Sequence, residues 1–334
     1  MSMQCPRCGS RDFDDGEPCA SCGFTKNKYP YKIISIGVFA LLLLASSLIY
    51  YAQNNPHESD IMLQAAEKEM EKGISILQEI ENDLDSLRDV HHETMNQAMK
   101  EREFASRSSE KVVSAIPRLE EAAFSFQRAE NFYKKCQSIH LSTQQEKYLH
   151  LELQRVSTYQ GYVSTLTELC GNYATYYQFS IFYLTGEQVL ITILSDIDRG
   201  NDRLESEDYT LAAAAYESAL RKLAVVDQEF TQAYAVLQLQ YVGEFLSNME
   251  HLEQALHNLK DAAQSLEKGN VVVANFLASQ GLEAVQRFSK INQSAFQTQM
   301  AVWYQSHVTD LLKKKNGLLK KIESIEEDIA KGRW

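Results

Sequence analysis

"RGNDRLESEDYTLAAAAYESALRKL", residues 199–223, decides the fold, because it predicts two helices packed against each other. Gly200 is a small residue in the first helix, and the segment "EDY" supplies the turn. After the turn, Ala212, Tyr216 and Ala219 follow one another at spacings of four and three, so they share one helix face. Small residues beside one large residue at a helix crossing predict a helical hairpin.

This hairpin resembles the tetratricopeptide repeat, in which the four residues just named fall at the offsets that pack two helices. A second stretch, residues 267–285, echoes it weakly, and Gly269 lies 69 residues after Gly200, close to two periods of about 34. The middle repeat is not evident, and the usual closing proline is absent. The alternative, which we favour slightly, is that any helical hairpin needs small residues where its helices cross.

The rest of residues 56–334 also predicts long helices. After Pro56 only Pro117 remains, and proline breaks helix interiors. Two heptad seams begin the region. The first is formed by Met70, Leu77, Leu84, His91 and Ala98, and the second by Gly73, Ile80, Leu87 and Thr94. A third apolar pattern ends the region, with Leu311, Leu318, Ile322, Ile325 and Ile329. The heptads decay, which favours helices in a bundle over a free-standing coiled coil. We therefore expect an all-α domain of long antiparallel helical hairpins, bundled or tetratricopeptide-like.

The helical region is strongly acidic. It holds 28 Lys/Arg against 41 Asp/Glu, a net charge of −13. Nucleic-acid binding needs a positive face, so we expect no nucleic-acid partner.

Four cysteines near the N-terminus form two CxxC pairs, Cys5 with Cys8 and Cys19 with Cys22. A glycine follows each pair, as the knuckles of a structural zinc site require, and two such turns complete a tetrahedral shell. A segment this short has no core of its own, so the metal would supply its folding energy. A pair of disulfides and an iron site are the alternatives to structural zinc.

An uncharged run, Ile33–Ala52, is twenty residues long and would span about 30 Å as a helix, the thickness of a bilayer core. Lys26, Lys28 and Lys32 precede it and no basic residue follows it closely, which predicts a cytoplasmic N-terminus. A cleaved signal peptide is the main alternative, but the run lacks a small-x-small cleavage site.

The motifs CPxCG and CxxCG followed by this run resemble the short zinc ribbons of bacterial and archaeal single-pass membrane proteins. The resemblance implies zinc on the four cysteines. It also implies a ribbon at residues 1–28, a transmembrane anchor with flanks at 29–55, and an extracytoplasmic helical domain at 56–334. The expected localisation is the cell membrane, with the lipid bilayer as one partner.

Two features of the helical region leave alternatives open. The aromatic segment "YATYYQFSIFY", Tyr173–Tyr183, is interpreted as core where hairpins meet, although a partner or ligand groove is the alternative. Cys136 and Cys170 lie outside the ribbon, and two buried free thiols are favoured over a disulfide.

No catalytic motif is present, and the eight histidines show no metal-ligand spacing. We therefore expect no enzyme and no catalytic or cofactor-binding residue. The leading hypothesis is a membrane-anchored adaptor, scaffold or sensor that binds unknown protein partners, with homo-oligomers left open. The alternative is an extracytoplasmic binding protein for a small molecule or a cell-envelope polymer.

Overall fold

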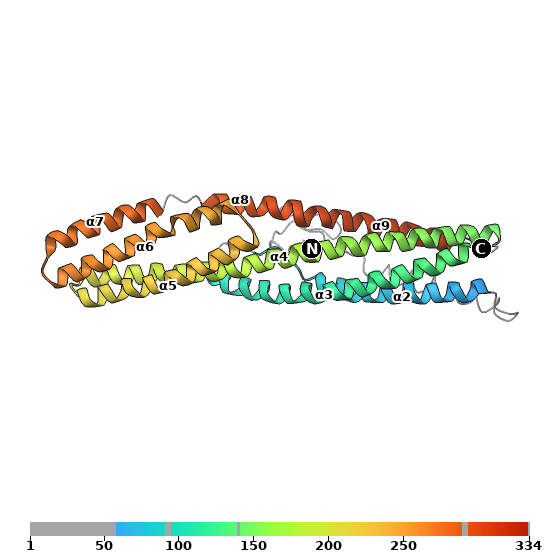
Figure 1. Cartoon of the computed structure of the whole chain (residues 1–334), viewed down its shortest axis with the longest axis horizontal. Coiled ribbons are helices and arrows are strands. Elements are labelled where there is room, and N and C mark those ends of the chain that lie inside the picture. Colours follow the sequence, from blue (N-terminus) through green and yellow to red (C-terminus); the bar gives the residue numbers. More distant parts are fainter. Residues whose placement is uncertain (1–57, 91–94, 139–140, 289–292, 333–334) are drawn as a thin grey trace, which may run out of the picture. The chain divides into compact units, whose positions relative to one another are not determined.

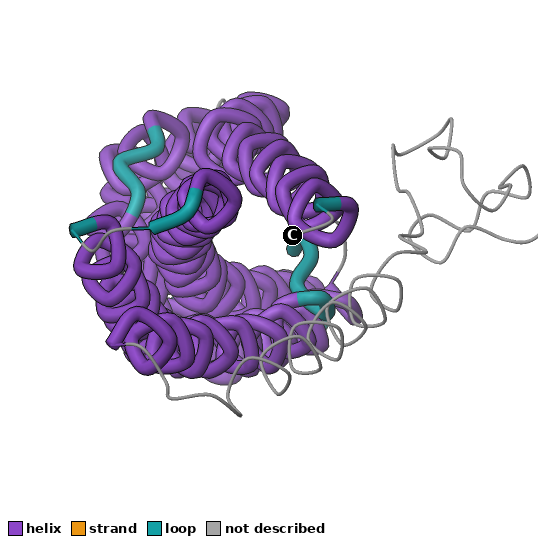
Figure 2. The backbone as a smooth tube through the Cα atoms, turned by 90° about the vertical axis from the view of Figure 1, so that its right-hand side faces the viewer, coloured by secondary structure: helices purple, strands orange, loops and turns teal. Residues whose placement is uncertain are grey.

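The computed structural model of the chain describes residues 58–90, 95–138, 141–288 and 293–332. Every regular element in these ranges is a helix (Figures 1 and 2). The helices are α2 (Glu58–Leu84), α3 (Met95–Gln137), α4 (Thr143–Glu205), α5 (Tyr209–Val236), α6 (Gln240–Glu267), α7 (Val271–Phe288), α8 (Gln293–Tyr304) and α9 (Asp310–Lys331). The predicted all-α class is confirmed for this part of the chain.

The predicted membrane anchor receives no support. Across the described ranges, no helix combines the length and the hydropathy that crossing a bilayer requires. The predicted localisation as a single-pass membrane protein is corrected by this finding. The ribbon (1–28) and the segment Ile33–Ala52 lie outside the described residues.

The longest helix, α4, runs for 63 residues without a proline. Its buried face carries hydroxyl side chains that donate hydrogen bonds to the carbonyl one turn back, as Thr165 does to Gly161 (2.9 Å) and Ser180 does to Tyr176 (2.9 Å). These bonds satisfy hydroxyl groups that burial would otherwise penalise. The helix can therefore be buried along much of its length although its composition is mixed.

The described helices divide into two compact units. Unit 1 is formed by residues 58–71, 125–160 and 317–332, and unit 2 by residues 72–124 and 161–316. Unit 1 thus combines one end of α2, α3, α4 and α9. The predicted C-terminal apolar pattern packs here, since Ile322, Ile325 and Ile329 are buried.

In unit 2, α6 packs on both α5 and α7, and the three helices are joined by short connections (Figure 1). Asp208 caps α5 by accepting a hydrogen bond from the Leu211 amide. Gly269 ends α6 with a φ of +75°, a conformation that glycine adopts without steric cost. The α4–α5 and α6–α7 connections therefore each have a residue that favours a tight reversal of the chain.

The hairpin predicted at residues 199–223 is present between α4 and α5. Ala212, Tyr216 and Ala219 are fully buried, and the Tyr216 ring lies against the Cα of Gly200. A Cβ on Gly200 would lie 2.6 Å from Cε1 of Tyr216, so only glycine fits the crossing as it stands. The small-residue argument therefore holds at this hairpin.

The first heptad seams fit the structure only in part. Met70, Gly73, Leu77 and Ile80 are buried in α2, but the helix ends at Leu84. The chain then extends through residues 87–90, so the predicted seams do not continue as one helix.

Candidate functional site

The predicted zinc ligands Cys5, Cys8, Cys19 and Cys22 lie outside the described residues. Within the described ranges, no group of three or more His, Cys, Asp or Glu side chains is arranged to hold a metal ion. Cys136 and Cys170 are both buried free thiols, in α3 and α4. The two buried free thiols confirm the prediction that was favoured over a disulfide.

The aromatic segment Tyr173–Tyr183 forms core, which confirms the favoured interpretation. Tyr173, Tyr176, Tyr177, Phe179 and Tyr183 are all buried in unit 2. Their rings make contacts with α8, including a stacked pair of Tyr183 and Phe296 with centroids 4.2 Å apart. Ring pairs of this kind contribute about 0.5–1.5 kcal/mol beyond their buried area.

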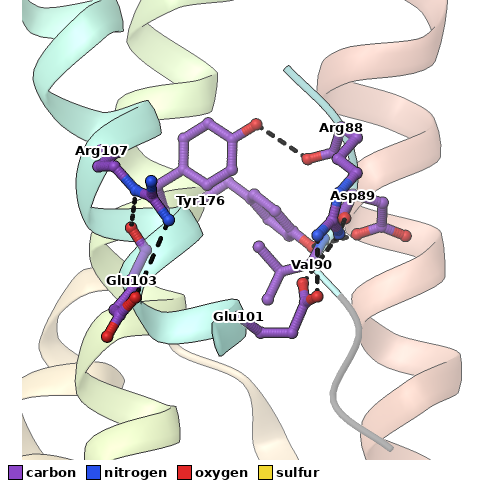
Figure 3. A network of polar contacts seen from close by, with 8 residues as sticks. Arg88, Asp89, Val90, Glu101, Glu103, Arg107 and Tyr176 are labelled. Atoms are coloured by element: carbon purple, nitrogen blue, oxygen red, sulfur yellow. Dashed lines mark hydrogen bonds and ion pairs between the residues drawn. The ribbon is translucent and has the colours of Figure 1, made fainter. Parts of the chain in front are cut away.

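Two tyrosine hydroxyls hold the extended chain after α2 (Figure 3). The amide of Val90 donates to the Tyr176 hydroxyl at 2.9 Å, and that hydroxyl donates to Asp89. The Tyr177 hydroxyl donates to the carbonyl oxygen of Arg88 at 2.9 Å. Burial is the main cause that raises the pKa of both phenols, so they stay neutral and act as hydrogen-bond partners only.

Arg88 adds a charged anchor to the same segment (Figure 3). Its two terminal nitrogens donate to the two carboxylate oxygens of Glu101, both at 2.8 Å. Its guanidinium also lies 4.1 Å from the centroid of the Phe104 ring. A bidentate pair beside an aromatic face fixes the connection between α2 and α3, which indicates a structural role.

A π-helical turn, Gln305–Thr309, joins α8 to α9. Such a turn disturbs the regular backbone ladder, and the side-chain amide of Asn172 donates to the His307 carbonyl at 2.7 Å. The His307 ring stacks on Trp303, with centroids 4.6 Å apart. These contacts occupy the Asn172 amide and the His307 ring with partners inside unit 2.

Several large apolar side chains of α7 are exposed in the described part of the chain. Val272, Phe276 and Leu282 are 81%, 63% and 60% exposed, and Val271 and Val273 are exposed as well. Val272 and Phe276 are four residues apart, so they lie one turn apart on the same side of the helix. The three valines are consecutive and point in different directions, and the exposed polar residues Asn275, Ser279 and Gln280 lie between the five apolar ones. We call the five apolar residues the α7 face.

Small residues pack the opposite side of α7 against α6. Ala274, Gly281 and Ala284 are the buried members of the helix. A Cβ built on Gly281 would lie 3.3 Å from the carbonyl oxygen of Ala255, so the two backbones approach closely there. The helix therefore buries its small residues and exposes its large apolar ones, the reverse of an ordinary surface helix.

Charge is also absent from most of the α7 face. No Asp, Glu, Lys or Arg occurs from Val271 through Leu282, and the first ion pair of the helix is Glu283 with Arg287 at 2.6 Å. The sequence reasoning missed this surface. The spacing of Ala274 and Gly281 by seven residues places both on one side of the helix and could have indicated that this side packs closely against another helix.

No family model, no curated protein and no solved structure matches this chain. The resemblance to zinc-ribbon single-pass membrane proteins is therefore not supported by any relative, and the described residues contain no membrane-spanning helix. The predicted membership of that family is wrong, and what the chain does has to be inferred from its own surfaces.

Proposed function

We propose that the protein is a non-enzymatic scaffold whose α7 face binds one amphipathic helix of a partner protein. The observation that carries this proposal is the group of exposed large apolar side chains on α7, with Val272 81% exposed. A group of large apolar side chains exposed on one helix is typical of interaction sites in proteins.

The size of the α7 face suits a helix. The exposed parts of its five side chains add up to roughly 500 Å², at the upper end of the largest patches on ordinary monomers. A partner that contributes an equal area would bury about 1,000 Å² in total, the lower limit for a specific interface. The five residues occupy positions 271–282, which span about 17 Å along the helix axis.

The charge pattern supports an apolar partner from another chain. An uncharged face disfavours charged partner residues at its centre, because their desolvation would not be compensated. An antiparallel pair of α7 helices aligned over their full length would place Phe276 of one copy opposite Glu283 of the other. A second copy of this chain is therefore the less suitable occupant.

The test uses the full chain with a photoreactive amino acid at position 276 and, as a control, at position 225, an exposed valine on α5. A cross-linked partner is identified and purified, and its affinity is then measured by calorimetry. We expect Phe276→Ser to weaken binding at least tenfold, because hot-spot aromatics contribute about 2 kcal/mol or more. Val225→Ser should leave the affinity unchanged.

Three results would overturn the proposal. An unchanged affinity in Phe276→Ser would remove the α7 face from the interface. A dimer of this chain seen by light scattering, and lost in Phe276→Ser, would make a second copy the occupant. Reproducible turnover of a substrate by the purified protein would remove the non-enzymatic assignment.

A further inference from the structure

A cluster of buried and half-buried polar side chains lies inside unit 1, at the contact of four helices. One member comes from α2, one from α3, four from α4 and one from α9: Glu67; Tyr133; Tyr148, Glu152, Arg155 and Tyr159; Glu326. We call this set the unit 1 cluster. It contains three carboxyl groups and one guanidinium, so it has more acidic groups than its single cation can balance.

Arg155 is shared between two of the three carboxyl groups. Its Nη2 and Nε donate to Glu326 at 2.8 and 3.1 Å, and its Nη1 lies 3.5 Å from Glu152. Burial opposes the positive charge of Arg155, but the carboxylates of Glu152 and Glu326 more than offset this, so its pKa is raised. The cation of the cluster is therefore fully used by these two partners.

The tyrosines complete the hydrogen bonds of these two carboxylates. Tyr159 donates to Glu326 at 3.1 Å, and Tyr133 donates to Glu152 at 3.2 Å. Glu152 is almost completely buried, and its side chain has no route to solvent that would screen its charge.

Glu67 is the carboxyl group that the cluster leaves without a cation. It accepts a hydrogen bond from the Tyr148 hydroxyl at 3.3 Å, and it forms no ion pair with a described residue. The charged and titratable groups that face it are Glu71 on its own helix, Tyr133 on α3, and Tyr148, Glu152 and Arg155 on α4. Burial first, and the charge of Glu152 second, raise the pKa of Glu67 from 4.5 to about 7.

This end of α2 is also held by an ion pair with α3, in which Nη1 of Arg128 lies 3.3 Å from Oε1 of Glu69, and by the half-buried Met62 and Leu63. Ala66 and Met70 are its buried apolar residues in unit 1, while Ile61 is exposed. The Cys136 thiol lies 3.8 Å from the Ser59 carbonyl, a weak hydrogen bond. A negative charge at the partly buried Glu67 would therefore act against this apolar contact and one ion pair between α2 and α3.

We propose that the unit 1 cluster is a proton-controlled latch: a proton on Glu67 holds residues 58–71 of α2 against α3 and α4, and loss of that proton releases them. The released segment exposes Glu67 to water, where the charged form is favoured. Opening is therefore coupled to the loss of one proton, and rising pH drives it. This regulation is independent of the α7 face, which belongs to unit 2.

The direction and size of the effect follow from linkage. Between pH 4.5 and 7 the closed latch keeps the proton while the open segment, with an ordinary glutamate, gives it up. The opening equilibrium should rise over this window and then level off. Because Glu67 is only partly buried, we expect the equilibrium constant for opening to increase about 100-fold over this window. This is less than the increase that the whole pKa shift of Glu67 would give.

The test is hydrogen–deuterium exchange of the full chain between pH 5 and 8, corrected for the intrinsic exchange rate at each pH. We expect peptides from residues 58–71 to lose protection as the pH rises, while peptides from α6 keep theirs. Glu67→Gln mimics the protonated side chain and should keep residues 58–71 protected at pH 8. Glu71→Gln, a matched change one turn later on α2, should retain most of the dependence on pH.

A second variant addresses the electrostatic cause. Glu152→Gln removes the nearest negative charge on α4 and lowers the pKa of Glu67 in the closed state, so the rise in opening should level off at lower pH and be smaller in total than in the wild type. The latch is refuted if residues 58–71 show the same protection at pH 5 and pH 8, or if Glu67→Gln opens with pH as the wild type does. Simultaneous loss of protection in α6 would also refute it, because it would indicate global unfolding.

Discussion

Gly200→Ala tests the packing of the α4–α5 hairpin, the element on which the fold prediction depended. The new Cβ would lie 2.6 Å from Cε1 and 2.7 Å from Cζ of Tyr216, whereas ordinary contact begins at 3.4 Å. The ring is fully buried and its hydroxyl donates to Asn201 at 2.7 Å. The ring cannot move into solvent, so the crossing has to widen or the hydrogen bond has to break.

The expected magnitude combines two opposing effects. Overpacking of a core costs about 1–3 kcal/mol, and loss of the Tyr216 hydrogen bond adds about 1 kcal/mol. Replacement of glycine by alanine inside a helix returns about 1 kcal/mol through the unfolded chain. We expect a net loss of about 1–3 kcal/mol in the free energy of unfolding.

Gly171→Ala is the matched control, because Gly171 lies in the same helix and the same unit and has no heavy atom within 4 Å of its added Cβ. This variant should gain about 0.5–1 kcal/mol. Urea denaturation followed by circular dichroism compares the two, with Tyr216→Leu as a second change that removes the ring. Equal stability of Gly200→Ala and Gly171→Ala would refute the packing argument. It would also be refuted if the stability losses of Gly200→Ala and Tyr216→Leu simply added in the double variant, because removal of the ring should relieve the clash.

Two further predictions concern a buried carboxyl group and the N-terminal cysteines. Burial raises the pKa of Glu187 to about 7, so its stabilising contribution is complete below pH 4.5 and is lost as the pH rises through 7. Glu187→Gln should reduce the change in unfolding free energy between low and high pH by up to about 3 kcal/mol. Urea denaturation of the wild type and the variant at pH 5 and pH 8 measures this change. An unchanged pH dependence in the variant would contradict the burial argument. For the cysteines, we expect one zinc per chain on Cys5, Cys8, Cys19 and Cys22, measured by metal analysis of the full protein. Zinc retained after Cys19→Ser with Cys22→Ser would exclude that ligand set.

Local sequence patterns predicted the helices and the hairpin because the necessary residues are close in the chain. Gly200 and Tyr216 are sixteen positions apart, and their sizes alone indicate a close crossing. The burial of Tyr173–Tyr183 followed in the same way, since a dense aromatic segment in a helical domain has its largest gain from burial. These predictions needed no knowledge of distant partners.

The α7 face lay beyond such reasoning for a different reason. The polar residues of α7, Asn275, Ser279, Gln280 and Glu283, indicate its exposed side, but periodicity alone does not predict that large apolar residues also lie on that side. The choice is made by α6, whose backbone approaches at Gly281 and leaves room only for small residues. The large residues are exposed because of that steric limit, which their own hydrophobicity would not predict.

The unit 1 cluster shows most directly why charged residues resist interpretation from sequence. Glu67, Arg155 and Glu326 are each embedded in ordinary helical sequence, where a solvated surface position is the usual expectation. Their burial arises from the meeting of three helices far apart in the chain, and it places three carboxyl groups around one guanidinium. An apolar set of the same size would pack with less electrostatic cost. The excess acid group instead makes this contact depend on a proton, and that dependence is what the exchange experiment on residues 58–71 measures.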